Sequence, residues 1–371
     1  MIRTVAIENY RSLQHVVTEL DRLTVVTGAN GSGKTSFYRA LRLLADLARE
    51  GAISTLAQEG GMRSALYAGG RSEPVVAMRL GFASDDMSYA IDLGLPQPGE
   101  HVSPFQLDPE IKVEAVWAGP VLRPATLLAD RHGPRVRTRG DDGEWRTADW
   151  RLGAHESLMS ALADPSETPE LYAIREQAKR WRFYDHMRTD AHAAARAPGI
   201  ATFTPVLAAG GEDLAAAQLT IQRVGVASVL TNAVADAFDG AQLELTEAED
   251  GTCRLGLRQR GLRRPLGARE LSDGTLRYLL LAAALLSPRP PGLLVLNEPE
   301  SSLHPSLMPA LGALVVDAAE RSQVVVVTHS GDLVRSLRPE ARLLELERSG
   351  GSTTVAGQLM FEGPEWARPK R

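Results

Sequence analysis

The segment GANGSGKT, at residues 28–35, constrains the fold more than any other stretch of this 371-residue chain. It follows the apolar run LTVVT and precedes KTSFYRALRLLADLARE, whose apolar residues recur at helical spacing. A glycine-rich turn between a strand and a helix, ending in Lys-Thr, is typical of a loop that holds phosphates. The curled backbone presents N–H groups, and the start of the helix adds positive potential. The sequence therefore predicts an α/β fold with a phosphate-binding loop.

Each residue type in this loop has a separate expected task. Glycines at positions 28, 31 and 33 let the backbone curl, Lys34 is expected to bridge the β- and γ-phosphates, and the Thr35 hydroxyl is expected to face Mg²⁺. A glycine-rich turn with an incidental Lys-Thr is the alternative, and it is disfavoured because the motif and both flanks agree. The candidate nucleotide-binding residues of the loop are Asn30, Gly31, Gly33, Lys34, Thr35 and Ser36.

Two apolar runs near the C-terminus end in polar residues. In LLVLNEPE the apolar run is followed by Asn297 and Glu298. In QVVVVTHS it is followed by Thr328, His329 and Ser330. Strands of this kind, alternating with helices, predict a parallel sheet covered on both faces, with ligands at the carboxyl ends of its strands. Glu298 is the candidate for orienting and polarising the attacking water, and its alternative is a solvated strand-end glutamate. His329 is the candidate γ-phosphate sensor, although a lone histidine is more often structural.

A third segment, LSDGTLRYLLLAAALL at 271–286, predicts a helix whose first turn could take an anion. Ser272 and Gly274 are its candidate ligand-binding residues, and an ordinary capped core helix is the alternative. His304, in the loop between Pro299 and Pro305, could be a subunit contact or a helix-start residue, and the sequence favours neither.

The distribution of predicted strands and helices along the chain predicts three segments. Residues 1–150 read as an N-terminal lobe with the phosphate loop and antiparallel strands, 151–240 as a mainly helical insert, and 241–371 as a C-terminal lobe. Within the insert, 155–190 is expected to be helical, notably TPELYAIREQAKRWRFYDHMR. Hairpins are expected at 73–96, around EDGT at 249–252, and at 341–357.

Composition narrows the class of protein. The formal net charge of −5 argues against a generally basic nucleic-acid coat, and the single cysteine, Cys253, excludes a disulfide framework or a Cys-rich zinc site. The N-terminus has no signal-peptide pattern, and the apolar stretch at 278–286 is far shorter than the ~20 residues of a membrane span. We therefore expect a cytoplasmic protein without membrane association.

The order of these motifs resembles that of ABC-type ATPase heads, and especially of the RecF/OLD/SMC-like ATPases that are often called AAA-family ATP-binding proteins. IENYRSL, LSDGTLRYLLLAAALL, NEPESSLHP and VVTHS carry the resemblance, over about residues 1–45 and 268–335. The family's zinc hook, coiled-coil arm and Toprim nuclease are expected to be missing. The implied fold is a P-loop ATPase head with a mixed or parallel central sheet, an antiparallel β subdomain and a helical insert.

The resemblance also implies residue roles. Lys34 and Thr35 would be Walker A residues, Asn297 and Glu298 Walker B residues, and His329 the switch residue. Ser272 and Gly274 would belong to a signature loop that completes the ATP site of a second subunit, so that a head-to-tail homodimer encloses two nucleotides. Arg11 would lie near the nucleotide, and no Q-loop glutamine can be placed.

Position 297 departs from the family pattern, in which an aspartate usually holds Mg²⁺ through water. An asparagine there brings no charge, so we expect weaker Mg²⁺ binding and slow ATP hydrolysis, with Thr35 and Asn297 as the metal-side residues. The expected function is ATP-gated action on DNA or on an effector protein, in DNA repair or phage defence. A non-hydrolysing nucleotide sensor and a transporter ATPase subunit are the alternatives.

Three arginine-rich stretches are candidates for a local DNA face: residues 131–140, 254–264 and 179–188. A solvated hairpin or helix face is the favoured alternative for each stretch, because acidic residues are interspersed among the arginines and the net charge is negative.

Overall fold

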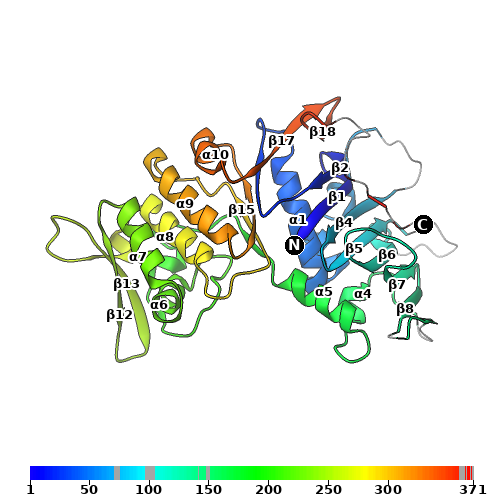
Figure 1. Ribbon diagram of the computed structural model, residues 1–371, viewed down its shortest axis with the longest axis horizontal. Coiled ribbons are helices and arrows are strands. Elements are labelled where there is room, and N and C mark those ends of the chain that lie inside the picture. The colour runs from blue at the N-terminus through cyan, green and yellow to red at the C-terminus, as the bar shows by residue number, and fades with distance from the viewer. Residues whose placement is uncertain are drawn as a thin grey trace. The chain divides into compact units, whose positions relative to one another are not determined.

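The computed structural model describes residues 1–70, 76–96, 105–140, 142–147, 151–358, 364, 366, 367 and 369. The chain forms two compact units. Unit 1 contains residues 1–21, 26–181 and 344–371, and unit 2 contains residues 22–25 and 182–343. Figure 1 labels the elements of both units.

Unit 1 is built on an eight-stranded antiparallel sheet with the order β2-β1-β4-β5-β6-β7-β8-β9. Alternating apolar residues in most of these strands supply its buried face. The strands are β1 (Ile2–Tyr10), β2 (Leu13–Glu19), β4 (Met78–Ser84), β5 (Met87–Gly94), β6 (Glu110–Ala118), β7 (Leu127–His132), β8 (Arg135–Arg139) and β9 (Trp145–Thr147).

Helix α1 (Lys34–Glu50) is the central helix of unit 1 and packs against β1 and β4 (Figure 1). Its apolar residues recur every three or four positions, so one face of the helix is buried, including Phe37, Leu41 and Leu44. The helices α2 (Ala52–Gln58), α3 (Met62–Ala65), α4 (Leu158–Ala161) and α5 (Pro169–Lys179) complete this layer. The hairpin of β17 (Arg342–Ser349) and β18 (Ser352–Val355) packs beside β2 within unit 1.

Unit 2 contains the parallel strands β10 (Arg182–Tyr184), β15 (Leu293–Asn297) and β16 (Gln323–Val327), followed by the start of β3 (Leu23–Thr27). All five residues of β15 and of β16 are buried, as expected for strands that are covered on both faces. The apolar core of unit 2 joins these strands to the helices α6 (Leu214–Val224), α7 (Ala227–Ala237), α8 (Asp273–Leu285) and α9 (Met308–Ala319).

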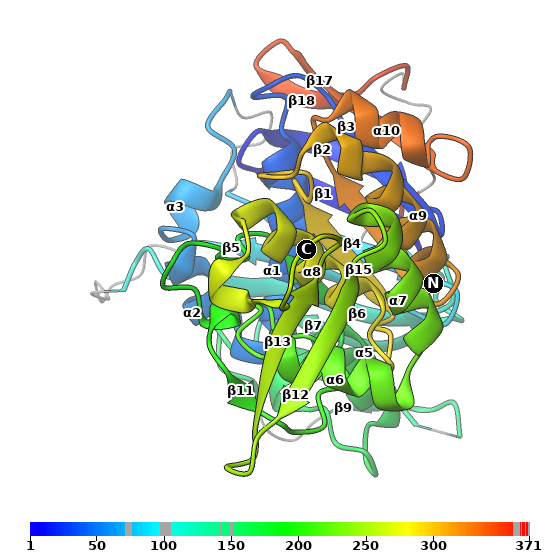
Figure 2. The ribbon, with the colours of Figure 1, turned by 90° about the vertical axis from the view of Figure 1, so that its left-hand side faces the viewer.

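A long hairpin forms the second sheet of unit 2. Strands β12 (Gln242–Glu247) and β13 (Thr252–Arg258) pair antiparallel, and the short strands β11 (Gly199–Ile200) and β14 (Leu266–Gly267) pair with β13. Figure 2 shows this hairpin beside α6 and α7, which contact it. The remaining elements of unit 2 are the α-helix α10 (Gly331–Leu337) and the 3₁₀ helices η1 (Ala194–Arg196), η2 (Ala268–Glu270) and η3 (Pro305–Leu307).

The predicted mixed α/β fold, with a parallel sheet and an antiparallel β part, is confirmed, and so are the described parts of the three predicted hairpins. Residues 73–75 of the first hairpin lie outside the described part of the chain. The division at residues 150 and 240 stays a prediction. None of the described helices is long and apolar enough to cross a lipid bilayer.

The expectation that residues 155–190 are helical is correct only for α4 and α5, and it is wrong after Lys179. Helix α5 ends at Lys179, and Arg182–Tyr184 form strand β10. The helical spacing of the upstream residues does not continue through Trp181, Phe183 and Tyr184, which are aromatic residues that suit a strand. Pairing with β15 satisfies the backbone of this segment, and that partner lies more than 100 residues away in the sequence.

A buried ion pair joins strands β6 and β7 in unit 1. Glu114 and Arg131 are both fully buried, with Arg131 Nη1 3.8 Å from Glu114 Oε2. The Tyr89 hydroxyl donates to Glu114 Oε1 at 2.6 Å, and the Leu158 N–H donates to Oε2 at 2.9 Å. Burial raises the pKa of Glu114 and lowers that of Arg131. Arg131 also donates to the carbonyls of Gly133, Gly153 and Glu156.

Replacing Glu114 by alanine should destabilise the protein by about 3–5 kcal/mol, because it leaves the Arg131 charge buried and uncompensated. Denaturant unfolding followed by tryptophan fluorescence measures the change, since buried Trp117 lies on the same strand as Glu114. Asp142→Ala is the control, because its partner Arg146 is exposed and screened by solvent. Equal unfolding midpoints for the two variants would show that the buried pair contributes nothing.

Candidate functional site

The phosphate loop has the backbone that its glycines predicted. Gly28, Gly31 and Gly33 have φ angles of 142°, 78° and 107°, a region that side chains with a Cβ rarely adopt. Close packing adds to this requirement. A Cβ at Gly28 would lie 2.1 Å from the Leu346 carbonyl oxygen, and one at Gly33 would lie 2.2 Å from Thr353 Oγ1. Two of these positions therefore exclude other residues through both conformation and space.

The start of α1 is arranged to receive an anion. Its N-cap, Gly33, has no side chain, and no described side chain caps the helix. The Lys34 ammonium folds back onto the loop and donates to the carbonyls of Gly28 at 2.7 Å and Ala29 at 3.0 Å. The buried Ser32 hydroxyl has no hydrogen-bond partner among the described residues. Uncapped N–H groups, the Lys34 ammonium beside the loop and a hydroxyl without a hydrogen-bond partner fit a bound polyphosphate.

The turn between β1 and β2 and the β17–β18 hairpin hold the loop in place within unit 1. Thr353 Oγ1 donates to the Ser32 carbonyl at 2.8 Å and lies 3.0 Å from Ser12 Oγ, which in turn lies 3.2 Å from Ser36 Oγ. Arg11 is adjacent in sequence but is engaged elsewhere, in an ion pair with Glu59. Its predicted contact with a nucleotide stays a prediction.

In unit 2, three parallel strands end at one edge of their sheet. The register pairs Tyr184 of β10 with Leu296 of β15, and Asn297 with Val327 of β16. The residues that follow these pairs therefore lie together. Asn297 Nδ2 donates to Asp185 Oδ1 at 2.9 Å, and the Glu298 N–H donates to the Val327 carbonyl at 2.8 Å.

Glu298 has the left-handed backbone conformation, with φ of 47°, which is uncommon for a residue with a side chain. Such conformations cluster at functional sites, where surrounding contacts maintain them. The side chain is 43% exposed, and its Oε1 lies 3.6 Å from Nδ1 of His329. The structure thus brings together the expected water-orienting carboxylate and the expected phosphate-sensing histidine.

Glu300 is a residue of this edge that sequence reasoning missed. Its buried Oε1 accepts from Thr328 Oγ1 at 2.5 Å and from the N–H groups of His329 at 3.1 Å and Ser330 at 3.2 Å. His329 Nδ1 lies 3.3 Å from the same oxygen. Glu300 therefore fixes the turn that follows β16. The available signal was the second glutamate of NEPE, two residues beyond Glu298.

Arg277 links the α8 helix to the same edge and was also missed. Its guanidinium donates to the carbonyls of Met187 at 3.1 Å, Asp185 at 3.0 Å and Glu298 at 3.5 Å. Burial lowers its pKa. A charged side chain inside an apolar helix was the available signal, because such a residue must find buried acceptors.

The predicted helix after LSDGT is confirmed as α8, with Ser272 as its N-cap. The Ser272 hydroxyl accepts from the Thr275 N–H at 3.1 Å and lies 2.9 Å from the Thr275 hydroxyl. A Cβ at Gly274 would lie 2.8 Å from the Ser302 carbonyl oxygen, so glycine there permits close packing within unit 2. His304 caps η3, with the Ser306 N–H donating to its Nδ1 at 3.2 Å, which favours the helix-start interpretation.

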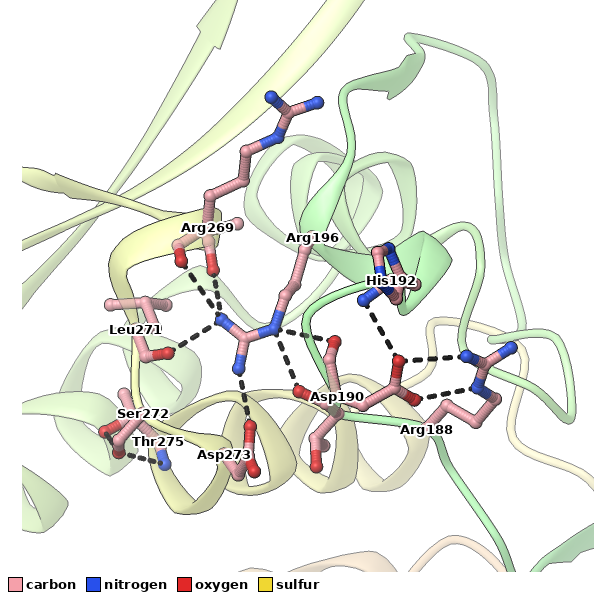
Figure 3. A network of polar contacts seen from close by, with 11 residues as sticks. Arg188, Asp190, His192, Arg196, Arg269, Leu271, Ser272, Asp273 and Thr275 are labelled. Atoms are coloured by element: carbon pink, nitrogen blue, oxygen red, sulfur yellow. Dashed lines mark hydrogen bonds and ion pairs between the residues drawn. The ribbon is translucent and has the colours of Figure 1, made fainter.

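Arg196 organises the chain that leads into α8 (Figure 3). The side chain is only 7% exposed, and its Nη1 donates to the carbonyls of Ala268 at 2.9 Å and Leu271 at 2.7 Å. Its Nη2 pairs with Asp273 Oδ1 at 2.7 Å, in the first turn of the helix. One guanidinium thus fixes the backbone on one side of Ser272 and a carboxylate on the other. Sequence reasoning missed this residue, since the surrounding segment AAARAPGI at 193–200 matches no motif.

The residues present fit Mg²⁺ only together with a nucleotide. No three His, Cys, Asp or Glu side chains of the described ranges gather as a ready-made cation site. A hydroxyl, a few carboxylate or amide oxygens, phosphates and water are the ligands that nucleotide-bound Mg²⁺ takes. Thr35 lies in unit 1 and Asn297 in unit 2, and both side chains carry such oxygens.

Residues 23–336 match the family described as "AAA domain, putative AbiEii toxin, Type IV TA system". A search of curated proteins found no match.

Solved structures of SMC heads share the fold. An SMC head bound to the C-winged helix domain of ScpA is 14% identical, with a TM-score of 0.53 over 96% of this chain and 97% of that chain. The SMC head domain from Thermotoga maritima is 13% identical, with a TM-score of 0.51 over 96% and 98%. An Smc head with an extended coiled coil, bound to the C-terminal domain of ScpA derived from Pyrococcus furiosus, is 13% identical, with a TM-score of 0.53 over 96% and 95%.

The family match spans both the phosphate loop and the strand edge that carries Glu298 and His329. The chain therefore belongs to this AAA family, it shares the fold of SMC heads, and it is an ATPase.

Proposed function

We propose that two copies of this chain close head to tail around two ATP molecules, and that ATP hydrolysis reopens them to release an effector protein. The observation that carries the proposal is that one chain has both an uncapped phosphate loop and a strand edge where a carboxylate lies beside a histidine. The uncapped start of α1 lies in unit 1, and the edge with Glu298 and His329 lies in unit 2. Each part is held by its own hydrogen bonds.

The residues of each part have distinct tasks in this proposal. Lys34 and the α1 N–H groups bind phosphates, with Asn30 and Ser36 beside them, and Thr35 and Asn297 hold Mg²⁺ with water. When bound, the metal neutralises phosphate charge. Glu298 accepts a hydrogen bond from the attacking water and orients it, while His329 donates to the γ-phosphate.

The signature helix supplies the reason for a dimer. Ser272 and Gly274 lie at the start of α8, where the N–H groups and the helix dipole favour an anion. In a head-to-tail pair, this start faces the phosphate of the other copy. The hydrogen bonds by which Arg196 fixes the backbone just before α8 support this assignment, because a docking surface requires fixed geometry.

Replacing Glu298 by glutamine should lower phosphate release by about 10²–10⁴-fold and leave ATP binding intact, because glutamine cannot take the proton of the attacking water. The same variant should trap the ATP-bound dimer, seen by light scattering as a doubling of the 40.0 kDa mass.

Glu320→Gln is the matched control for this experiment, since Glu320 pairs with Arg22 at the surface of unit 2. Phosphate release at the same rate from Glu298→Gln and wild type would end the role proposed for Glu298. A mass that stays at 40.0 kDa with ATP would contradict the proposed dimer.

Arg196→Ala should reduce ATP-dependent dimerisation while each monomer still binds ATP, because the loop that binds phosphate lies in the other unit. The expected loss is on the order of tenfold in the dimer dissociation constant, measured by sedimentation with ATP. Arg188→Ala is the control, as Arg188 forms an exposed pair with Asp190. Normal dimerisation of Arg196→Ala would contradict the proposed use of the α8 entrance.

The charges of the described residues favour an effector protein over DNA. Arg131, in the first arginine-rich stretch, is fully buried. Acidic residues pair with the arginines at positions 137, 188, 258 and 264. The matching SMC heads are bound to domains of ScpA, a protein partner. Type IV toxin–antitoxin function in the family's description is consistent with control of a second protein, in phage defence or DNA maintenance.

One observation keeps the DNA alternative open. Arg260 and Arg263, in the turn after β13, are exposed and have no acidic partner among the described residues. If they form a DNA contact, labelled duplex DNA should bind at low salt with ATP, and Arg260→Ala with Arg263→Ala should weaken it and reduce its salt dependence. Fluorescence anisotropy measures this, and Arg146→Ala with Arg335→Ala serves as a charge-matched control. We expect no ATP-dependent binding for wild type, in agreement with a protein effector.

A further inference from the structure

We infer that Asp185 supplies the carboxylate that Asn297 lacks on the Mg²⁺ side of the ATP site. This inference rests on the proposed function, because it concerns the same nucleotide site. The expectation of weak Mg²⁺ binding came from strand β15 considered alone. Strand β10, which was not predicted, places a second polar residue beside it.

The parallel register carries the first step of the argument. Residues 182, 183 and 184 of β10 pair with residues 294, 295 and 296 of β15. The next residue of each chain, Asp185 and Asn297, therefore ends its strand at the same level of the sheet. Asn297 Nδ2 donates to Asp185 Oδ1 at 2.9 Å, so the two side chains lie in direct contact.

The hydrogen bond between Asn297 and Asp185 also determines which of their polar atoms remain free to bind a ligand. Because the Asn297 amide nitrogen donates to Asp185, the amide carbonyl oxygen is left to accept from elsewhere. Together the pair has one carboxylate and one amide. An aspartate at the end of β15 beside an uncharged residue at the end of β10 would supply the same single negative charge. The charge is thus displaced by one strand rather than lost.

The surroundings keep Asp185 available for a hydrated cation. Its side chain is 23% exposed, and Asn297 is only 8% exposed. His186 Nδ1 lies 3.5 Å from Asp185 Oδ1, but that histidine is 95% exposed. Arg277 holds the Asp185 backbone carbonyl at 3.0 Å, which fixes where the carboxylate is presented. A positioned carboxylate with open solvent on one side can accept hydrogen bonds from Mg²⁺-bound water.

The test measures binding of a fluorescent methylanthraniloyl ATP with EDTA and across a Mg²⁺ titration, without turnover as a readout. Asp185→Asn should raise the Mg²⁺ concentration needed for half-maximal tight binding by roughly tenfold. Binding in EDTA should be unchanged or slightly tighter, because one carboxylate that repels the free triphosphate is removed. Asp236→Asn, at an exposed position of α7 in the same unit, is the matched control and should behave as wild type.

The exchanged pair, Asp185→Asn with Asn297→Asp, returns the carboxylate to β15 and can keep the hydrogen bond between the strands. It should recover a Mg²⁺ requirement within a few fold of wild type. A purely structural role for Asp185 predicts a lowered unfolding midpoint and an unchanged Mg²⁺ requirement in the single variant.

Two outcomes would overturn the inference: a single variant with the Mg²⁺ requirement of wild type, or a loss that the exchanged pair does not repair. Wild-type protein that fails to bind the nucleotide under either condition would instead overturn the proposed ATP site, so the two failures can be told apart.

Discussion

The parallel pairing of β10, β15 and β16 is the constraint on which the functional half of unit 2 depends. Parallel strands present their carboxyl ends at one edge, so side chains from residues 185, 297 and 328–329 are brought together although they are far apart in the chain. Without this register, the Asn297–Asp185 hydrogen bond and the approach of His329 to Glu298 could not form. The sheet interior is apolar, and the polar groups appear only where the strands end.

Buried arginines hold the turns around this edge. Arg277 donates to three backbone carbonyls in the segments that follow β10 and β15, and Arg196 donates to carbonyls at the entrance of α8. Since Arg277 lies on α8 itself, the signature helix and the strand edge are joined through one side chain. A shift of α8 would therefore also displace the segments that carry Asp185 and Glu298.

The motifs with fixed backbone chemistry were predictable. GANGSGKT requires left-handed glycines and a helix start, and the structure has both. The buried strands before Asn297 and Thr328 were evident from continuous apolar runs. Strand β10 was not, because three residues after a helix carry too little periodicity, and their partner lies more than 100 residues away. The roles of the arginines and of Glu300 were hidden for a related reason, since most of their hydrogen-bond partners are backbone groups: carbonyls accept from the arginines, and N–H groups donate to Glu300.

The sequence by itself determined the class of fold, the phosphate loop and the identity of the residues that end β15 and β16, because these follow from local spacing and from the conformations that glycine permits. Only the tertiary structure decided which polar groups meet. It placed a carboxylate beside the uncharged Asn297, a buried glutamate under the turn at His329, and Arg196 at the entrance of α8. These contacts depend on strand register and burial, and both are set by pairing between distant segments rather than by any local pattern.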